Sequence, residues 1–310
     1  MTITADLVKT LRERTGAGMM ECKRALVETS GDLDAAAEIM RKAGLAKADK
    51  KAARIAAEGA VVVATSANGR SAVLVEVNCE TDFVARQLEF QSFASAVAQA
   101  ALQASAATIH GVAMLPLPGG ASVEETRRNL IARIGENITI RRLGHLDAST
   151  LVGSYVHGIR IGTLVSLQGG NDVLARDLAM HVAAANPQYI EPADVPESIL
   201  AKEREILAAQ AATVGKPAAI VDKMVEGRLR KYLGEICLTG QPFVKDPDTT
   251  VGKLLESAGA TVTGFLRYEV GEGIERKQEN FAEEVMAQVK AAEGRRLGER
   301  AWRKRSPGSR

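Results

Sequence analysis

The sequence predicts an α+β protein with a small N-terminal helical module, a two-part α/β core with antiparallel sheets, a projecting antiparallel helical hairpin and a C-terminal helix. Three observations support this prediction. Apolar residues recur every three or four positions in the first 58 residues, as in short amphipathic helices. The pattern then changes to short apolar runs around Asn68-Gly69, a strong hairpin signal. Residues 190–236 return to two helical stripes separated by a Gly-Lys-Pro break at 215–217.

The N-terminal part, residues 1–58, is expected to hold three short helices and a linker. Thr4 can cap the first helix, and the Gly-Ala-Gly run at 16–18 ends it. The Ser-Gly-Asp run at 30–32 separates the second helix from a third, which should end near Gly44. Residues 47–58 are rich in alanine and lysine and predict a helical connector to the core.

The first part of the core, residues 59–148, begins with the predicted hairpin. Its second strand runs to Cys79, and Thr81 or Asp82 can then cap a long helix to about Ala104. Residues 105–122 contain prolines and glycines and predict a loop. A helix over 123–134 and a strand over 138–143 should follow.

The second part of the core is expected to combine residues 149–189 and 237–275. A hairpin followed by a helix occurs near 60–104 and again near 153–185, which suggests an internal structural repeat. Between them, residues 190–236 predict an antiparallel helical hairpin, an arm too thin to bury both of its faces. Such an arm suggests a protein partner, and a second copy of the chain is one candidate. Residues 276–310 are expected to form a helix near 280–292 and a basic tail.

Composition excludes several classes of protein. The chain has 310 residues, enough for two domains or several small modules at ~150 residues each. It carries 40 basic and 38 acidic residues, but residues 295–310 hold seven basic side chains and one acidic one. The remaining body is therefore slightly acidic, unlike a general nucleic-acid binder. Three separated cysteines, no secretory signal and no long apolar run predict a cytoplasmic protein without a membrane segment.

The motifs of common enzyme sites are also missing. Gly215-Lys216 is followed by proline, so it is no phosphate-binding loop of the Walker type, and the glycines at 16–18 lie between helices rather than after a strand. None of the four histidines has metal-ligand spacing, and no nucleophile-elbow motif occurs. We expect no enzymatic activity, no catalytic residue, no cofactor and no metal.

A series of segments resembles the bacterial elongation factor Ts family. TGAGMMECK, NCETDFVA and LTGQPFV are together highly specific, and IGENITIRR, GSYVHG, KMVEGRLRK and GFLRYEVGEG also occur, with all seven segments in the family's order. The resemblance covers about residues 2–287; the loop at 105–122 and the basic tail depart from it. It implies a UBA-like N-terminal module and guanine-nucleotide exchange on elongation factor Tu, the GTPase that delivers aminoacyl-tRNA. The nucleotide site would belong to that partner, so this chain should bind no nucleotide directly.

The resemblance also implies a contact site at Thr81, Asp82, Phe83 and Val84. In the family, the Asp-Phe pair enters the GTPase domain beside its Mg²⁺ site, with the phenylalanine as an apolar wedge and the acid near the metal's water shell. The alternative is that Phe83 is a core residue of a helix and Asp82 its N-cap.

Four further residues match family contacts, each with a structural alternative. Lys23 belongs to the module that docks on the GTPase, or to a solvated charged face. Ile134 and Gly135 match one contact edge, or a helix end with a C-cap glycine. His157 matches a contact to the GTPase core, or is a turn histidine.

The remaining interpretations concern the arm and the buried groups. The arm matches a segment that the family links to self-association and that would make a homodimer; alternatively it folds back on the core. His181 is expected in the core, and Cys22 and Cys79 as small buried hydrophobic residues.

Two other functions stay open. The chain could be a non-enzymatic adaptor or nucleic-acid-associated protein that uses the helical module and the basic tail; its binding would fall steeply with salt. An enzyme that uses His157 with an acid would need a pocket.

Overall fold

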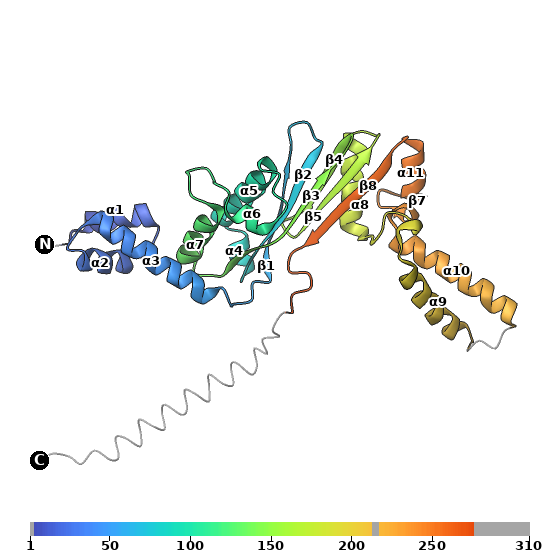
Figure 1. The fold of residues 1–310 in the computed structure, drawn as a ribbon, viewed down its shortest axis with the longest axis horizontal. Helices are drawn as coiled ribbons and strands as arrows, with labels where there is room; N and C mark the ends of the chain where they lie inside the picture. The colour runs from blue at the N-terminus through green and yellow to red at the C-terminus, as the bar shows by residue number, and fades with distance from the viewer. Residues whose placement is uncertain (1–2, 213–216, 276–310) are drawn as a thin grey trace, which may run out of the picture. The chain divides into compact units, whose positions relative to one another are not determined.

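The computed structural model describes residues 3–212 and 217–275, and all elements below belong to one compact unit, Met1–Glu272 (Figure 1). The fold is mixed helix and sheet with small antiparallel sheets, which confirms the predicted α+β class. The division into domains stays a prediction. The predicted helix near 280–292 and the basic tail lie outside the described residues. No helix in the described part of the chain has the length and hydropathy to cross a membrane.

Three helices come first: α1 (Ala5–Thr15), α2 (Met19–Glu28) and α3 (Leu33–Lys51). Thr4 caps α1, as predicted, Asp32 caps α3, and the three helices enclose a small core around Leu11 and Leu26. The prediction that the third helix ends near Gly44 is wrong, because α3 runs through that glycine. An interior glycine costs a helix about 1 kcal/mol relative to alanine, and packing of α3 against a later helix offsets it, with Gly44 lying on Ala132.

The first sheet has the strand order β1-β2-β3, formed by β1 (Glu58–Thr65), β2 (Ser71–Cys79) and β3 (Ile138–Asp147). The predicted hairpin is confirmed: Val62 pairs with Val75, and the turn lies at Asn68-Gly69. Four helices follow β2 in the chain: α4 (Asp82–Ala85), α5 (Leu88–Gln103), α6 (Ile109–Ala113) and α7 (Val123–Ile134). Helix α5 packs on β1 and β2 and contributes Phe90 and Val97 to the largest apolar cluster.

Two predictions for this region are corrected. The long helix expected from residue 81 to about Ala104 is divided into α4 and α5, because Gln87 has an extended backbone (φ −69°, ψ 136°). The break lets Val84 and Ala85 pack into the core from α4 while Phe90 packs from the start of α5. The expected loop at 105–122 contains the short helix α6, whose Val112 is buried in the same core.

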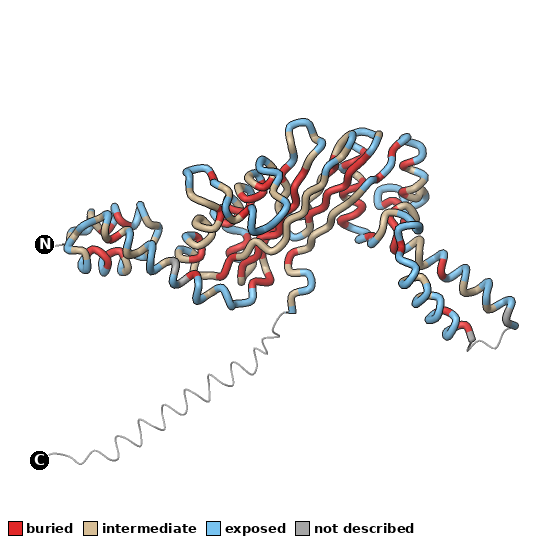
Figure 2. Tube along the Cα trace, in the orientation of Figure 1, coloured by how far each residue is buried: buried red, intermediate tan, exposed pale blue. Residues whose placement is uncertain are grey.

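The second sheet has the strand order β4-β5-β8, formed by β4 (Leu151–His157), β5 (Ile161–Gln168) and β8 (Thr261–Glu269). Helix α8 (Asp172–Ala185) packs on β4 and β5. In both sheets a hairpin leads into helices and a later strand pairs with the second hairpin strand, so the topology supports the suggested internal repeat. Buried residues line the strands of both sheets (Figure 2).

The helical hairpin consists of α9 (Glu197–Ala212) and α10 (Ala218–Ile236), which lie side by side (Figure 1). A small apolar cluster with Tyr189, Ile199 and Tyr232 joins its base to the core. The remaining elements around it are η1 (Pro192–Asp194), η2 (Leu238–Gly240), β6 (Pro242–Phe243), β7 (Asp246–Thr250) and α11 (Val251–Ser257). The sequence did not predict β6 and β7, because two paired residues in a strand are too few to show a period.

The two sheets pack face to face through small and aliphatic residues. A Cβ atom at Gly162 of β5 would collide with Val61 and Leu74 of the first sheet, so this close approach requires glycine. Val61, Leu74 and Leu164 are buried in one cluster that spans both sheets.

A buried carboxylate lies beside this contact. Glu76 of β2 is fully buried and accepts hydrogen bonds from Arg141 Nη1 at 3.1 Å and Arg142 Nε at 2.5 Å, both from β3. It also accepts from the backbone N–H of Gly271, just after β8, at 2.8 Å. Burial by itself would raise the pKa of Glu76, but the hydrogen bonds from Gly271 and Arg142 outweigh it and hold the pKa below its usual value.

We predict that Glu76→Gln destabilises the fold by about 3–5 kcal/mol at pH 7, because it removes the buried charge that pairs with the partly buried guanidinium groups of Arg141 and Arg142. Since the folded-state pKa is lowered, the stabilisation is fully present above the unfolded-state value near 4.5 and is lost as pH falls through the folded-state pKa. Urea unfolding at stepped pH should therefore show the gap between wild type and variant closing below about pH 4.5. The exposed Glu256→Gln is the control, and a gap that stays constant down to pH 3 would contradict the argument.

Candidate functional site

The turn that follows β2 presents an aromatic side chain to solvent. Thr81 is the N-cap of α4, and its Oγ1 accepts a hydrogen bond from the Val84 N–H at 3.3 Å. Within this single helical turn Val84 and Ala85 face the core, whereas Phe83 points away from it and is 78% exposed. The interpretation of Phe83 as a core residue is therefore wrong.

Asp82 lies in the first turn of α4 and is not the N-cap, since Thr81 has that role. Its carboxylate is half-exposed and lies 3.4 Å from the Arg86 guanidinium, one turn later. A solvent-exposed pair of this kind contributes little to stability and can exchange partners. Asp82 therefore stays available to a cation or a cationic group that approaches beside Phe83.

A shallow hollow connects this turn with the end of α7. Thr81, Phe83, Val84 and Ile134 line it, so the structure brings together four of the residues selected from the sequence. The other lining residues are Gly16, Gln87, Glu89, Arg133 and Glu136. Figure 1 shows α4 and α7 in the same part of the fold, although they are about fifty residues apart in the chain.

Gly135 follows Ile134 and is the C-cap of α7, with φ +89° in the left-handed region that favours glycine. Its N–H donates to the Ile131 carbonyl at 2.9 Å, and its own carbonyl accepts a hydrogen bond from Lys51 Nζ at the end of α3. The C-cap interpretation is correct for its conformation. A contact between Gly135 and a partner stays a prediction.

Two carboxylates next to these residues were not selected from the sequence. Glu136 Oε2 accepts from the backbone N–H groups of Glu80 at 3.1 Å and Thr81 at 3.0 Å, and its Oε1 accepts from the Thr81 hydroxyl at 2.7 Å. In return, Glu80 Oε1 accepts from the Asn137 N–H at 2.6 Å. Both glutamates stand in the segments that carry the resemblance, but their pairing joins residues 55–57 positions apart and leaves no periodic signal.

Lys23 and His157 lie elsewhere on the fold and are not among the described residues that line the hollow beside Phe83. Lys23 is exposed on α2, as on a solvated face. His157 is the last residue of β4, and its Nδ1 lies 3.1 Å from the Tyr155 hydroxyl, on the exposed end of the strand. It precedes a tight turn, which agrees with the interpretation as a turn histidine.

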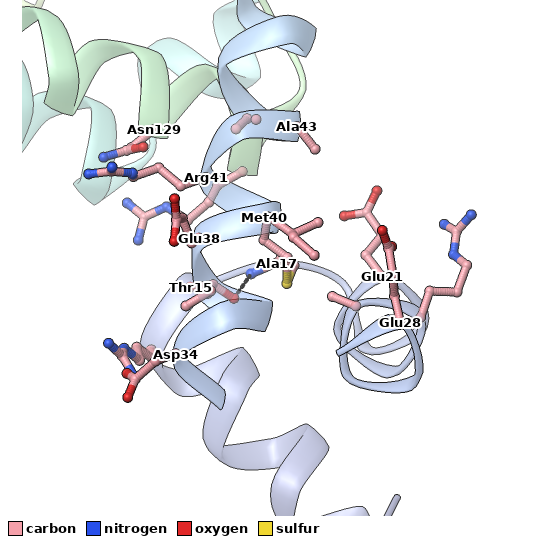
Figure 3. A pocket seen from close by; sticks show the side chains of 18 of the residues that line it. Thr15, Ala17, Glu21, Glu28, Asp34, Glu38, Met40, Arg41, Ala43 and Asn129 are labelled. Carbon is pink, nitrogen blue, oxygen red and sulfur yellow. Dashed lines mark hydrogen bonds and ion pairs between the residues drawn. The ribbon is translucent and has the colours of Figure 1, made fainter. Parts of the chain in front are cut away.

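A second hollow lies between the N-terminal helices and α7, and Figure 3 shows side chains from α2, α3 and α7 around it. Arg14 and Asp34 form a 2.6 Å ion pair at its edge. Met40 and Ala43 supply apolar surface on the α3 side.

Met19 and Met20 are exposed at the start of α2. The helical pattern in the sequence did not distinguish these two exposed positions from core positions.

Ser71, His145 and Asp147 are the nearest approach to a catalytic arrangement among the described residues. Ser71 Oγ lies 2.7 Å from His145 Nε2, and Asp147 Oδ1 lies 3.2 Å from the same nitrogen. A hydrolytic triad needs the acid on the opposite ring nitrogen from the nucleophile. This cluster therefore lacks the geometry for relaying a proton.

The buried histidine and cysteines have the surroundings of structural core residues. His181 is buried, as predicted, with Nε2 at 2.9 Å from Gln241 Oε1 and Nδ1 accepting from the Val244 N–H at 3.2 Å; burial lowers its pKa. Cys22 and Cys79 are buried, also as predicted. Burial and, to a smaller extent, the negative charge of Glu136 raise the pKa of Cys79 to about 12, so this thiol is unreactive. Among the described residues, no group of three or more His, Cys, Asp or Glu side chains could hold a metal ion.

Comparisons with known proteins agree on one family. A family model described as Elongation factor TS matches residues 80–272. Elongation factor Ts of Thioalkalivibrio sulfidiphilus is 61% identical over 294 residues, which cover 94% of this chain and 100% of that protein. Elongation factor Ts of Methylococcus capsulatus is 58% identical over 293 residues (94% and 100%), and that of Halorhodospira halophila is 58% identical over 290 residues (94% and 99%).

The exposure of Phe83 predicts that the fold does not depend on its ring. Phe83→Ala should change the free energy of unfolding by no more than about 0.5 kcal/mol, as for other surface positions. Phe90→Ala, which empties a fully buried site on α5, should cost about 3–5 kcal/mol. Urea unfolding of both variants measures the difference, and equal losses would mean that Phe83 packs against the protein in solution.

Proposed function

Because the chain belongs to the bacterial elongation factor Ts family and is therefore a translation elongation factor, we propose that it is a guanine-nucleotide exchange factor for elongation factor Tu. It binds the GDP-bound GTPase, disturbs the Mg²⁺ and phosphate site, and promotes release of GDP. The observation that carries the proposal is the exposed Phe83 beside Asp82, on a turn whose other residues are held by the core.

Exchange is a linkage effect. The factor speeds GDP loss if it binds the nucleotide-free GTPase more tightly than the GDP-bound form. Reciprocity then requires that GDP weaken the binding of the factor by the same ratio. GTPases hold their nucleotide through phosphate-loop amides and a bound Mg²⁺. A factor that displaces elements around the metal therefore gains affinity only when the nucleotide has left.

Phe83 and Asp82 supply the two kinds of group that this displacement needs. The Phe83 ring is a rigid apolar knob that can enter between packed elements of the partner, where burying an aromatic side chain is strongly favourable. Asp82 brings a carboxylate whose present partner, Arg86, lies on the surface and is easily replaced. Thr81 and Val84 fix the turn, and the nucleotide site itself belongs to the partner.

Further contacts complete the proposed interface. Ile134 and Gly135 form a second edge beside the hollow, while Lys23 and His157 reach other parts of the GTPase. The chain acts as a binding catalyst in the cytoplasm rather than as an enzyme with its own reaction chemistry. The α9–α10 hairpin is proposed to serve self-association.

The first test is release of fluorescent GDP from elongation factor Tu, with catalytic amounts of this chain. Phe83→Ala should slow the accelerated release at least roughly thirtyfold, since an aromatic hot spot contributes about 2 kcal/mol or more. Val173→Ala, which removes another exposed apolar side chain, is the matched control and should exchange at the wild-type rate.

The other outcomes each have a meaning. Full activity of a folded Phe83→Ala would keep the function and move the contact to Ile134, Gly135 or His157. A folded wild-type chain that does not accelerate release would refute the proposal. Binding that falls steeply with salt would then favour the adaptor or nucleic-acid-associated alternative.

A second prediction concerns the metal. Asp82→Ala should reduce exchange less than Phe83→Ala does, by roughly fivefold at millimolar Mg²⁺, which corresponds to about 1 kcal/mol for one screened charge. The deficit should shrink when Mg²⁺ is chelated, because the carboxylate then has no metal shell to disturb. Asp172→Ala, in the first turn of α8, is the control. If the deficit is the same with and without Mg²⁺, Asp82 does not act through the metal.

A further inference from the structure

The polar groups of Thr81 that hold the Phe83 turn are bound on several sides. Its N–H and its hydroxyl both donate to Glu136, at 3.0 and 2.7 Å. Its carbonyl accepts a hydrogen bond from Cys79 Sγ at 3.1 Å. Since Thr81 Oγ1 also caps Val84, the Glu136 carboxylate connects through one hydroxyl to the helical turn that carries Phe83.

This arrangement continues the first sheet beyond its last backbone pair. The β2–β3 ladder ends where Cys79 pairs with Ile138. After that point the side chains of Glu80 and Glu136 take over, each accepting from backbone N–H groups of the opposite segment. These hydrogen bonds therefore fix the direction in which the chain leaves the sheet, although its backbone no longer pairs with β3.

The equivalent turn of the second sheet provides a comparison within the same chain. There Asn171 caps α8 through Leu174 at 3.0 Å, Asp172 follows, and Val173 is 70% exposed before the buried Leu174 and Ala175. The order of cap, aspartate, exposed apolar residue and two buried residues matches 81–85. The reciprocal hydrogen bonds of Glu80 and Glu136 are made at the first turn, the one that carries the aromatic residue.

We propose that Glu136 is a positioning residue for exchange: its carboxylate holds the Thr81–Val84 backbone so that Phe83 meets the GTPase in its bound orientation. This inference rests on the proposed function. An exposed side chain on a mobile turn would lose conformational freedom on binding, and that loss weakens association. A turn fixed before binding avoids the loss, so Glu136 acts on exchange through the Thr81–Val84 backbone that it holds.

The main experiment is a double-mutant cycle in the GDP-release assay. Glu136→Ala should slow accelerated release roughly three- to tenfold, because one or two side chains must then be ordered during binding and that ordering weakens association. Glu136→Gln keeps a single acceptor oxygen for three donors and should fall between wild type and alanine. In the Phe83→Ala background, Glu136→Ala should cause no further loss, because its effect passes through the missing ring.

Amide hydrogen exchange of the free chain tests the positioning directly and needs no partner. Glu136→Ala should speed exchange at the amides of Glu80, Thr81 and Val84, while amides in the middle of β2 keep their protection. Asn171→Ala, which removes the equivalent cap of α8, is the matched control: it should lower global stability by about as much as a lost cap and leave GDP release unchanged.

The outcomes separate this inference from the proposed function. A wild-type chain without exchange activity would refute the function, and the role of Glu136 in exchange with it. If the wild type is active, a folded Glu136→Ala variant that releases GDP at the wild-type rate overturns the positioning role. It is also overturned by losses that multiply in the double variant, or by unchanged amide protection at Thr81 and Val84.

Discussion

The buried carboxylate of Glu76 is the interaction on which the arrangement of the core depends. It joins the central strand of the first sheet to Arg141 and Arg142 of the neighbouring strand and to the Gly271 N–H after the last strand of the second sheet. A buried anion is tolerated only where donors surround it, so these segments must come together for the fold to form. The same strand leads directly into the Phe83 turn.

Burial and exposure are divided sharply within that turn. Val84 and Ala85 are part of the largest apolar cluster, whereas Phe83 and, just after the helix break, Leu88 (83% exposed) face solvent. Single exposed apolar residues are common on protein surfaces. Here the exposed ring lies on a short helix whose cap and backbone are bound to a second segment of the chain. In the proposed interface, a ring supported in this way is ordered before a partner binds, which favours precise and selective binding.

The two sheets share a topology but differ at corresponding turns. Both place a capped helix after the second hairpin strand, with an exposed apolar residue at the second helical position. The first turn breaks after four helical residues, and the second continues as the fourteen-residue α8. The break at Gln87 lets α5 change direction and cover β1 and β2, so the short turn is left as a separate projecting feature.

The sequence by itself determined the features that depend on neighbouring residues. The Asn68-Gly69 hairpin, the cap at Thr4, the helix at 123–134 and the family motifs are local patterns, and each was predicted correctly. Tertiary structure decided the rest. The passage of α3 through Gly44 depends on packing against α7, and the exposure of Phe83 depends on the break before α5. The long-range partners of Glu76 and Glu136 lie from 55 to 195 residues away in the chain. Periodicity and capping report only the nearest few residues, so such long-range hydrogen bonds and packing contacts leave no trace in a single sequence.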